Sequence, residues 1–404
     1  MSTSILYHAF EIREYVYMRT RHKDGSTVFE VERGDLRRLR CPQCRSYDVT
    51  RKGIVVRRLR MEPIGMRQNF LEVSIQRVAC AACGVTRQVS LPFADPRSSY
   101  TRRFERYALE LSKVMTIGDV ASHLGISWDT VKEFQKRYLR KRFEKPKVGK
   151  LKLLAVDEIH VGKLTFLTVV MDLKTGAVVF VGDGKDSEAL APFWQRLKRA
   201  RARIQAVAMD MGRAFIHAVR RNLPEATIVF DHFHVIKLFN ERLSQLRRDE
   251  QKKADDQGKE VLKGTRWLLL KRPRNLDDER NEAERLREAL EANQSLATAY
   301  YMKEDLGRIW RQMDRESAAF LLDDWIKRAV VSGIGMLVRF AKTLVAHREG
   351  VLAYYDFDGI STGPLEGMNN KIGLLQRRAY GFSDMEFFKL KIMALHEATA
   401  VLIG

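Results

Sequence analysis

The chain has 404 residues, and because single hydrophobic cores stop growing near roughly 250 residues, we expect two or three domains. It carries 72 Lys and Arg against 51 Asp and Glu, and the net charge of +21 favours a polyanionic partner, with nucleic acid first. Charged residues interrupt every long apolar run and the N-terminal segment lacks a signal-peptide pattern, which argues against a membrane protein and predicts a cytoplasmic, nucleoid-associated one.

The positive charge is concentrated in the first part of the chain. Residues 1–150 hold 31 Lys and Arg against 16 Asp and Glu, so they carry +15 of the +21. We therefore expect the main nucleic-acid-binding surface in this part.

All four cysteines of the chain occur in two Cys-x-x-Cys pairs, which are Cys41, Cys44, Cys80 and Cys83. Such pairs bring four thiolates to one tetrahedral Zn²⁺, and a site with four protein ligands is structural. The alternative is free thiols or a redox pair, but no βαβ pattern surrounds either pair. Two short strands are expected at 49–60 and 69–78, broken by Pro63 and Gly65. The sequence predicts a small zinc-ribbon-like module within residues 1–96.

Residues 97–150 are expected to form a helix-turn-helix and a basic linker. A helix is predicted over 99–115, and the segment 116–131 is typical of two helices joined at a tight turn, with Gly125 in the turn. The second helix would present its polar side to the DNA major groove. The residues expected on that side are Ser127, Trp128, Lys132, Gln135, Lys136 and Arg140. The alternative is an ordinary helical hairpin with a solvated basic face.

The third domain, residues 151–404, begins with an antiparallel meander followed by alternating helices and strands. The strands are expected at 151–160, 164–173, 177–182, 204–209 and 227–230, with helices at 187–202 and 213–222. This order predicts a mixed sheet of the ribonuclease-H-like kind. Asp157 would end the first strand and Asp210 the fourth, so their carboxylates would converge if these strands are neighbours.

A third acid, Glu366, lies in the first turn of a predicted helix that follows Pro364. Asn369 and Asn370 share its helix face. Three basic residues of the same helix could bind phosphates, and they are Lys371, Arg377 and Arg378.

Acids on separate elements of a DNA-binding chain suit phosphodiester chemistry. Two Mg²⁺ ions can activate a nucleophile and stabilise the leaving oxygen, and hard oxygen ligands suit them; the sequence does not separate Mg²⁺ from Mn²⁺. Taken singly, each acid also has a structural explanation. Asp157 could close a strand, Asp210 could cap a helix, and Glu366 could favour a helix N-terminus.

Four segments of the third domain resemble the ISL3 family of bacterial insertion-sequence transposases. They are Ala155-Val-Asp-Glu-Ile159, Ala208-Met-Asp-Met211, Phe230-Asp-His-Phe-His-Val235 and Pro364-Leu-Glu-Gly-Met-Asn-Asn-Lys-Ile372, the last followed by Arg377-Arg-Ala-Tyr-Gly-Phe382. The resemblance implies that Asp157, Asp210 and Glu366 are the three catalytic, metal-binding acids. The family also carries an N-terminal Cys-pair zinc motif and a helix-turn-helix, so the resemblance implies both here. It further implies that the partner is double-stranded DNA.

Two further features are hypotheses. Asp231 and His234 resemble an Asp-x-x-His signature of several transposases, although a histidine bonded inside the core is an equal alternative. Residues 236–360 should be a large, mostly helical insertion. Within it, Trp267 could stack on an unpaired base, but beside three leucines we expect it to pack in the core.

The resemblance predicts a transposase that binds terminal inverted repeats, hydrolyses the transposon ends and transfers the freed 3′-hydroxyl into target DNA. Because two ends must be held together, a homodimer or higher assembly is expected. One alternative is a ribonuclease-H-like nuclease or resolvase without strand transfer. Another is a zinc and helix-turn-helix regulator without enzymatic activity.

Overall fold

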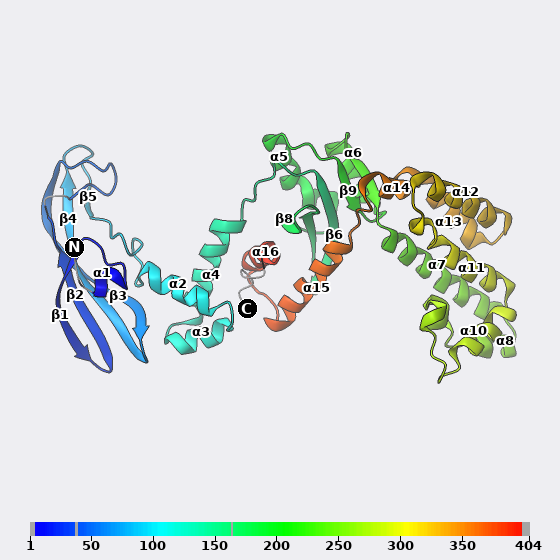
Figure 1. The fold of residues 1–404 in the computed structure, drawn as a ribbon, viewed down its shortest axis with the longest axis horizontal. Coiled ribbons are helices and arrows are strands. Elements are labelled where there is room, and N and C mark those ends of the chain that lie inside the picture. Colours follow the sequence, from blue (N-terminus) through cyan, green and yellow to red (C-terminus); the bar gives the residue numbers. More distant parts are fainter. Residues whose placement is uncertain (1–4, 37–38, 163–164, 398–404) are drawn as a thin grey trace. The chain divides into compact units, whose positions relative to one another are not determined.

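The computed structural model of the chain describes residues 5–36, 39–162 and 165–397. These residues form two compact units, and the division falls between Lys141 and Arg142. Figure 1 shows the first unit in blue to cyan and the second in green to red. None of the described helices combines the length and the apolar character that a bilayer crossing requires.

The first unit is built on a five-stranded sheet. Its strands are β1 (Tyr15–Lys23), β2 (Ser26–Arg33), β3 (Val49–Ile64), β4 (Arg67–Cys80) and β5 (Thr86–Gln88). The order is β1-β2-β4-β3, with β5 paired to β4; β2 and β4 run parallel and the other pairs antiparallel. Val31, Leu59 and Val73 are buried in its core together with Leu6 of the short helix α1 (Ile5–His8).

This sheet is larger than the predicted hairpin. Pro63, expected to break the strand, lies inside β3. It is tolerated there because the β3–β4 pairing is irregular at this point, so the missing N–H removes no regular hydrogen bond between the strands. Strands β1 and β2 were not predicted. Their signal was the pair Asp24-Gly25, with φ of 47° and 71°, a sequence that favours two-residue hairpin loops.

Three helices follow the sheet, and they are α2 (Arg102–Leu111), α3 (Ile117–Leu124) and α4 (Trp128–Phe143). Helix α2 is shorter than expected because Thr101 caps its start, where its Oγ1 accepts the Phe104 N–H, and the helix ends at Ser112.

The turn between α3 and α4 confirms the predicted helix-turn-helix. Gly125 ends α3 with a φ of 62°, a left-handed conformation that favours glycine. The Ser127 Oγ accepts the Thr130 N–H at 3.2 Å and so caps α4. The Arg60 side chain of β3 donates to the Leu124 carbonyl oxygen at 3.1 Å, which joins sheet and helices within the first unit.

The second unit contains a mixed five-stranded sheet. Its strands are β6 (Leu153–Gly162), β7 (Thr165–Asp172), β8 (Ala177–Asp183), β9 (Ala206–Met209) and β10 (Thr227–Phe230). The order is β10-β9-β6-β7-β8, with β6, β7 and β8 antiparallel and β9 and β10 parallel to β6. The expected meander and the adjacency of β6 and β9 are confirmed. Asp157 lies within β6 and does not end it, because β7 pairs with β6 as far as Gly162.

Helices cover both faces of this sheet. After the 3₁₀ turn η1 (Ser187–Leu190), helices α5 (Ala191–Ala200) and α6 (Arg213–Asn222) pack on the face that carries Leu154 and Val156. Helix α15 (Gly363–Arg378) lies along β6, and α16 (Met385–Ala394) lies against β8 (Figure 1).

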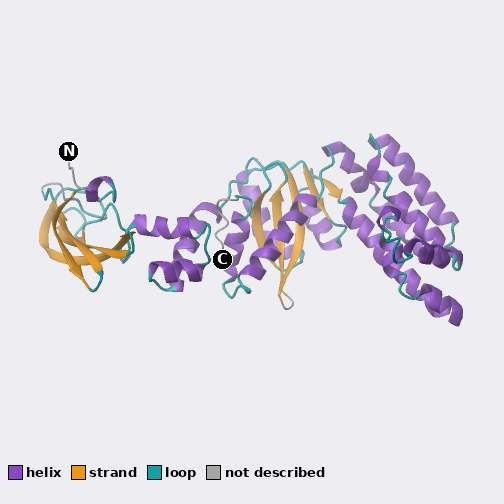
Figure 2. Cartoon of the chain, turned by 60° about the horizontal axis from the view of Figure 1, so that its bottom comes forward, coloured by secondary structure: helices purple, strands orange, loops and turns teal. Residues whose placement is uncertain are grey.

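The expected helical insertion separates β10 from α15. Its helices are α7 (His232–Lys253), α8 (Asp256–Leu262), α9 (Arg266–Leu270), α10 (Glu282–Glu291), α11 (Gln294–Leu306), α12 (Arg315–Val331), α13 (Gly335–Ala346) and α14 (Arg348–Leu352), with 3₁₀ turns η2 (Pro273–Asn275), η3 (Ile309–Arg311) and η4 (Ala353–Phe357). Edge-to-face rings of Phe239, Trp325 and Phe340 lie in its core. Figure 2 shows these helices gathered beside the sheet, where α14 contacts β10.

Candidate active site and zinc site

The pairing of β6 with β9 brings two acids together. The last paired residues are Ala155 and Ala208. Asp157 and Asp210 each lie two positions beyond that pair, where the strands no longer bond to each other. The Asp210 Oδ1 accepts the Gly212 N–H at 2.9 Å, which holds the turn between β9 and α6.

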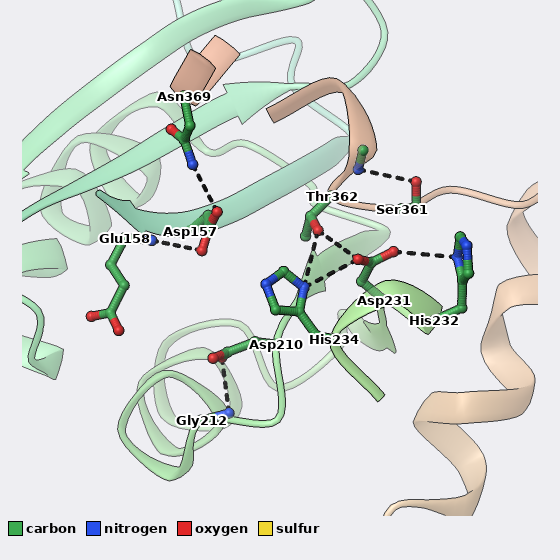
Figure 3. Close-up of polar contacts among 11 residues, drawn as sticks. Asp157, Glu158, Asp210, Gly212, Asp231, His232, His234, Ser361, Thr362 and Asn369 are labelled. Atoms are coloured by element: carbon green, nitrogen blue, oxygen red, sulfur yellow. Dashed lines mark hydrogen bonds and ion pairs between the residues drawn. The ribbon is translucent and has the colours of Figure 1, made fainter. Parts of the chain in front are cut away.

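Helix α15 carries the third acid close enough for its charge to act on Asp157. Glu366 lies in its first turn, with Pro364 also there, and its N–H donates to the Thr362 carbonyl at 2.9 Å. One turn further, Asn369 donates from Nδ2 to Oδ2 of Asp157 at 2.8 Å (Figure 3). The start of α15 is therefore held at the middle of β6.

The charges of the other two acids act on Asp157. The pKa of Asp157 is raised, first by burial and then by the negative charges of Asp210 and Glu366, although the Glu158 N–H and the charge of His234 oppose this. Glu158 is exposed, and in Figure 3 its carboxylate points away from the one on Asp157. Alternation along β6 explains this, since neighbouring residues face opposite sides of the sheet.

A buried network lies beside these acids. Asp231 is 1% exposed, and its Oδ2 accepts hydrogen bonds from the Thr362 hydroxyl at 2.9 Å and from the His234 Nδ1 at 3.1 Å. Burial raises the pKa of Asp231, but the bonds from His232, His234 and Thr362 outweigh it and hold the pKa well below its usual range. Thr362 is the residue that precedes α15. This network therefore joins the start of α7 to the start of α15 (Figure 3).

The pKa of His234 is raised, chiefly by its hydrogen bond to Asp231 and further by the charges of Asp157, Asp231 and Asp210. The His234 ring thus lies close enough to the acids for their charges to act on it. The sequence left two explanations for His234, a role at the acidic site or a hydrogen bond inside the core. The structure contains the hydrogen bond to Asp231, and it also brings the ring near Asp157 and Asp210.

The donor types of this group suit a hard divalent cation, although among the described residues the four cysteines alone gather closely enough to form a ready metal site. Three carboxylates supply oxygen atoms, and the Oδ1 of Asn369 is a buried atom with no hydrogen-bond partner among the described residues. Carboxylate and amide oxygens are the ligands that Mg²⁺ and Mn²⁺ prefer.

The four cysteines converge in the first unit, where their Sγ atoms all lie within 4.8 Å of one another. The two knuckles share one backbone pattern. In each, the N–H of the first cysteine donates to the carbonyl five positions on, and a residue with positive φ, Arg45 or Gly84, follows the second cysteine.

The crowded thiols differ in pKa. The Cys44 N–H lowers the pKa of Cys41 to about 6, whereas burial and the neighbouring thiols raise the pKa of Cys83 to about 12 against the effect of the Val85 N–H. Crowded thiols of this kind hold protons that a Zn²⁺ ion would displace.

One predicted DNA contact on α4 is wrong. Gln135 is 0% exposed and lies on the inner side of the helix with Val131 and Leu139, so it faces the core. The other residues predicted there reach the surface at least in part, and Trp128 is 49% exposed with the Lys132 ammonium over its ring. Ser127 already serves as the N-cap.

The expectation that Trp267 packs in the core is also wrong. It is 63% exposed, with the Arg266 guanidinium 4.7 Å from its ring centre, while Leu268 and Leu269 point inward. The short helix α9 buries only one side, and the indole lies on the other. Lys371, Arg377 and Arg378 are all exposed on α15, as expected.

Thr362 was not singled out from sequence. Its type suits a helix cap, so the local signal existed. Its partner Asp231 lies 131 positions away, and no local pattern indicates that contact.

A helix-turn-helix together with an acidic site on a mixed sheet is typical of a DNA-processing enzyme of the transposase class. Residues 154–392 match a family described as a transposase, and residues 89–139 match the helix-turn-helix domain of transposase family ISL3. The chain belongs to the ISL3 family of insertion-sequence transposases, enzymes that cut and transfer DNA.

Relatives and one solved structure are similar over most of their lengths. The transposase for insertion sequence element IS1001 of Bordetella parapertussis is 34% identical over 366 residues, 89% of each chain. The transposase for IS1557 of Mycobacterium tuberculosis is 28% identical, over 85% of this chain and 82% of that one. The Drosophila P element transposase strand transfer complex aligns with 75% of this chain and 93% of that chain, at 12% identity and a TM-score of 0.41.

Proposed function

We propose that this chain binds the terminal inverted repeats of its transposon, hydrolyses the phosphodiester bonds at the ends, and joins each freed 3′-hydroxyl to target DNA. Asp157, Asp210 and Glu366 are the proposed catalytic residues. The observation that carries this proposal is the hydrogen bond from Asn369 to Asp157, because it brings the helix of Glu366 to the strand of Asp157.

The second unit is proposed to be a ribonuclease-H-like catalytic domain. Numbered within its own sheet, the strand order is 3-2-1-4-5, with the first three strands antiparallel and the last two parallel to the first. This order supports the proposal, because it leaves Asp157 and Asp210 side by side where pairing of β6 with β9 ends.

Asp157, Asp210 and Glu366 would hold Mg²⁺ or Mn²⁺, and the four cysteines would hold a structural Zn²⁺. Bound divalent cations would activate the attacking oxygen and stabilise the leaving one. Asn369 orients the Asp157 carboxylate. Asp231 acts as a positioning residue, since its buried carboxylate fixes Thr362 and with it the helix of Glu366.

The first unit is proposed to recognise the transposon ends. The exposed side of α4, with Trp128, Lys132, Lys136 and Arg140, would enter the major groove, while Lys371 and the two arginines of α15 would bind phosphates near the cut. Because two ends react together, the working form is proposed to be a homodimer or a larger assembly on nucleoid DNA.

A donor plasmid carrying the native flanks of the gene tests the proposal when incubated with the full chain and Mg²⁺. We expect cleavage at the ends and joined products, and Asp157→Asn, Asp210→Asn and Glu366→Gln to lower cleavage by about 10³-fold, because several kcal/mol of transition-state stabilisation are removed. Glu158→Gln is the matched control and should retain activity.

The outcomes separate the alternatives. Cleavage without joined products would support a nuclease or resolvase. Binding without any cleavage by the wild type would support a regulator. Full activity of Asp210→Asn would refute the assignment of the acids.

A further inference from the structure

The turn that ends α15 carries an aromatic residue in a conformation that favours glycine. Tyr380 has a φ of 51°. The Gly381 N–H donates to the Gln376 carbonyl at 3.0 Å and the Tyr380 N–H to the Arg377 carbonyl at 3.2 Å, the paired bonds of a Schellman helix end. Glycine is the usual residue at this left-handed position, because a side chain there crowds the backbone.

The Tyr380 side chain gains no packing in return for this strain. Its relative exposure is 101%, the value of a ring that touches nothing else in the described chain. Phe382, two residues on, stacks on Phe388 with ring centres 4.5 Å apart. One aromatic residue of the turn therefore anchors the chain, and the other is left facing solvent.

The turn is held firmly on both sides. Before it, the Gln376 Nε2 donates to the Val161 carbonyl at the end of β6, and after it the Phe382–Phe388 stack fixes the chain. The backbone on both sides of Tyr380 is thus tied to the rest of the second unit, which limits the backbone entropy lost when a ligand stacks on the ring.

The surroundings of Tyr380 are cationic. Arg377 and Arg378 immediately precede it, both are exposed, and neither guanidinium has an ion-pair partner among the described residues. An open aromatic face beside free guanidinium groups is the combination that binds unpaired nucleic acid, where bases stack and phosphates pair with Arg.

Tyr380 and the two arginines lie at the end of α15, and Glu366 lies at its start. Glu366, Gly373 and Arg377 share one helix face by their spacing. The rise from Glu366 to Arg377 is about 17 Å, which corresponds to roughly five nucleotide steps of a DNA strand. A strand with its reacting phosphate at Glu366 would reach Tyr380 within its first few bases.

We propose that Tyr380 is a stacking platform for an unpaired base of the DNA strand near the cut, with Arg377 and Arg378 binding the flanking phosphates. This inference rests on the proposed function, because it takes the strand to be the one held at Glu366. The reaction supplies such bases, since cleavage leaves strand ends whose terminal pairs open.

A forked DNA, a duplex with a single-stranded dT arm, tests the proposal against its fully paired counterpart. Affinities of the full chain are measured without added divalent cation. We expect the wild type to prefer the fork, Tyr380→Gly and Tyr380→Leu to bind the fork about tenfold more weakly with duplex affinity unchanged, and Tyr380→Phe to match the wild type. Because glycine suits the turn, Tyr380→Gly should melt no lower than the wild type.

Three results would overturn the proposal. The first is unchanged fork affinity of Tyr380→Gly, and the second is an equal loss on the paired duplex. The third is a smaller assembly in light scattering with DNA affinity unchanged, which would assign Tyr380 to a protein contact. Fork binding is measured without divalent cation and plasmid cleavage with it, so the platform and the catalytic acids are tested separately.

Discussion

Asn369 on α15 and Asp157 on β6 are joined by a 2.8 Å hydrogen bond although 212 positions separate them in the sequence. The helical insertion lies between them along the chain, yet it leaves the sheet and the last part of the chain free to meet. The bond fixes the orientation of one carboxylate relative to the helix of another. The contact therefore determines the geometry of the proposed active site.

Replacing Asn369 by alanine should reduce cleavage by about 10- to 100-fold, since partners that orient a metal ligand typically contribute this much. Stability should change little, because one partly buried bond is lost. Plasmid cleavage and melting temperature measure the two effects. Asn370→Ala, on the exposed neighbour, is the matched control, and an equal loss of activity in both variants would contradict the assigned role.

Thr362→Val removes the hydroxyl that donates to buried Asp231 while keeping the shape of the side chain. We expect a loss of about 1–3 kcal/mol in unfolding free energy, because a buried carboxylate loses a donor. Cleavage should also fall, since Thr362 precedes the helix of Glu366. Denaturant unfolding gives the free energy. Ser361→Ala, one residue earlier and less buried, loses only the exposed hydrogen bond that its Oγ accepts from the Gly363 N–H, and it should change both quantities less.

The Asp231–His234 pair predicts a pH dependence of stability. Because the pKa of His234 is raised in the folded state, its contribution to folding stability is complete below the ordinary histidine pKa. That contribution is lost as pH rises through the pKa that His234 has in the folded protein. The lowered pKa of Asp231 means that its contribution is present above the ordinary aspartate pKa and is lost as pH falls. The melting temperatures of wild type and Asp231→Asn should therefore differ most between about pH 4 and 6.5, and the difference should shrink at higher pH as the His234 part is lost. A constant difference up to pH 9 would contradict this.

The cysteine cluster should bind one zinc ion per chain, measured by elemental analysis of the purified protein. Cys44→Ser or Cys80→Ser should release the metal and destabilise the first unit by on the order of 4 kcal/mol or more, as expected for loss of a structural ion. Ser46→Ala, in the same knuckle, should keep the metal. Full zinc content in both cysteine variants would refute the site.

The sequence predicted that Gln135 contacts DNA, whereas its burial predicts that it does not. Both its amide atoms are buried without partners among the described residues, so Gln135→Leu should stabilise the chain by about 1 kcal/mol and leave DNA affinity unchanged. Trp128→Ala, on the exposed side of α4, should weaken DNA binding instead. Thermal melting and duplex titration check the pair. Loss of DNA affinity in Gln135→Leu would restore this residue as a contact.

The sequence by itself determined the local elements of this protein. Spacing alone indicated the two cysteine knuckles, the turn at Gly125, and the order of strands and helices from β6 to β10, because each depends on neighbouring residues and on periodicity. The same local patterns placed Asp157, Asp210 and Glu366 on their elements. Matching segments then related those acids to one family.

Only the tertiary structure decided which groups meet and which side chains are buried. Helical spacing placed Gln135 on a polar side, but the packed structure buries it completely. Helix α9 left Trp267 exposed where an apolar neighbourhood suggested a core. Contacts such as Asn369 with Asp157, or Thr362 with Asp231, join residues far apart in the chain. Local sequence carries no record of such contacts, since they arise when separate elements pack together. The strain and the exposure of Tyr380 likewise follow only from its backbone conformation in the structure.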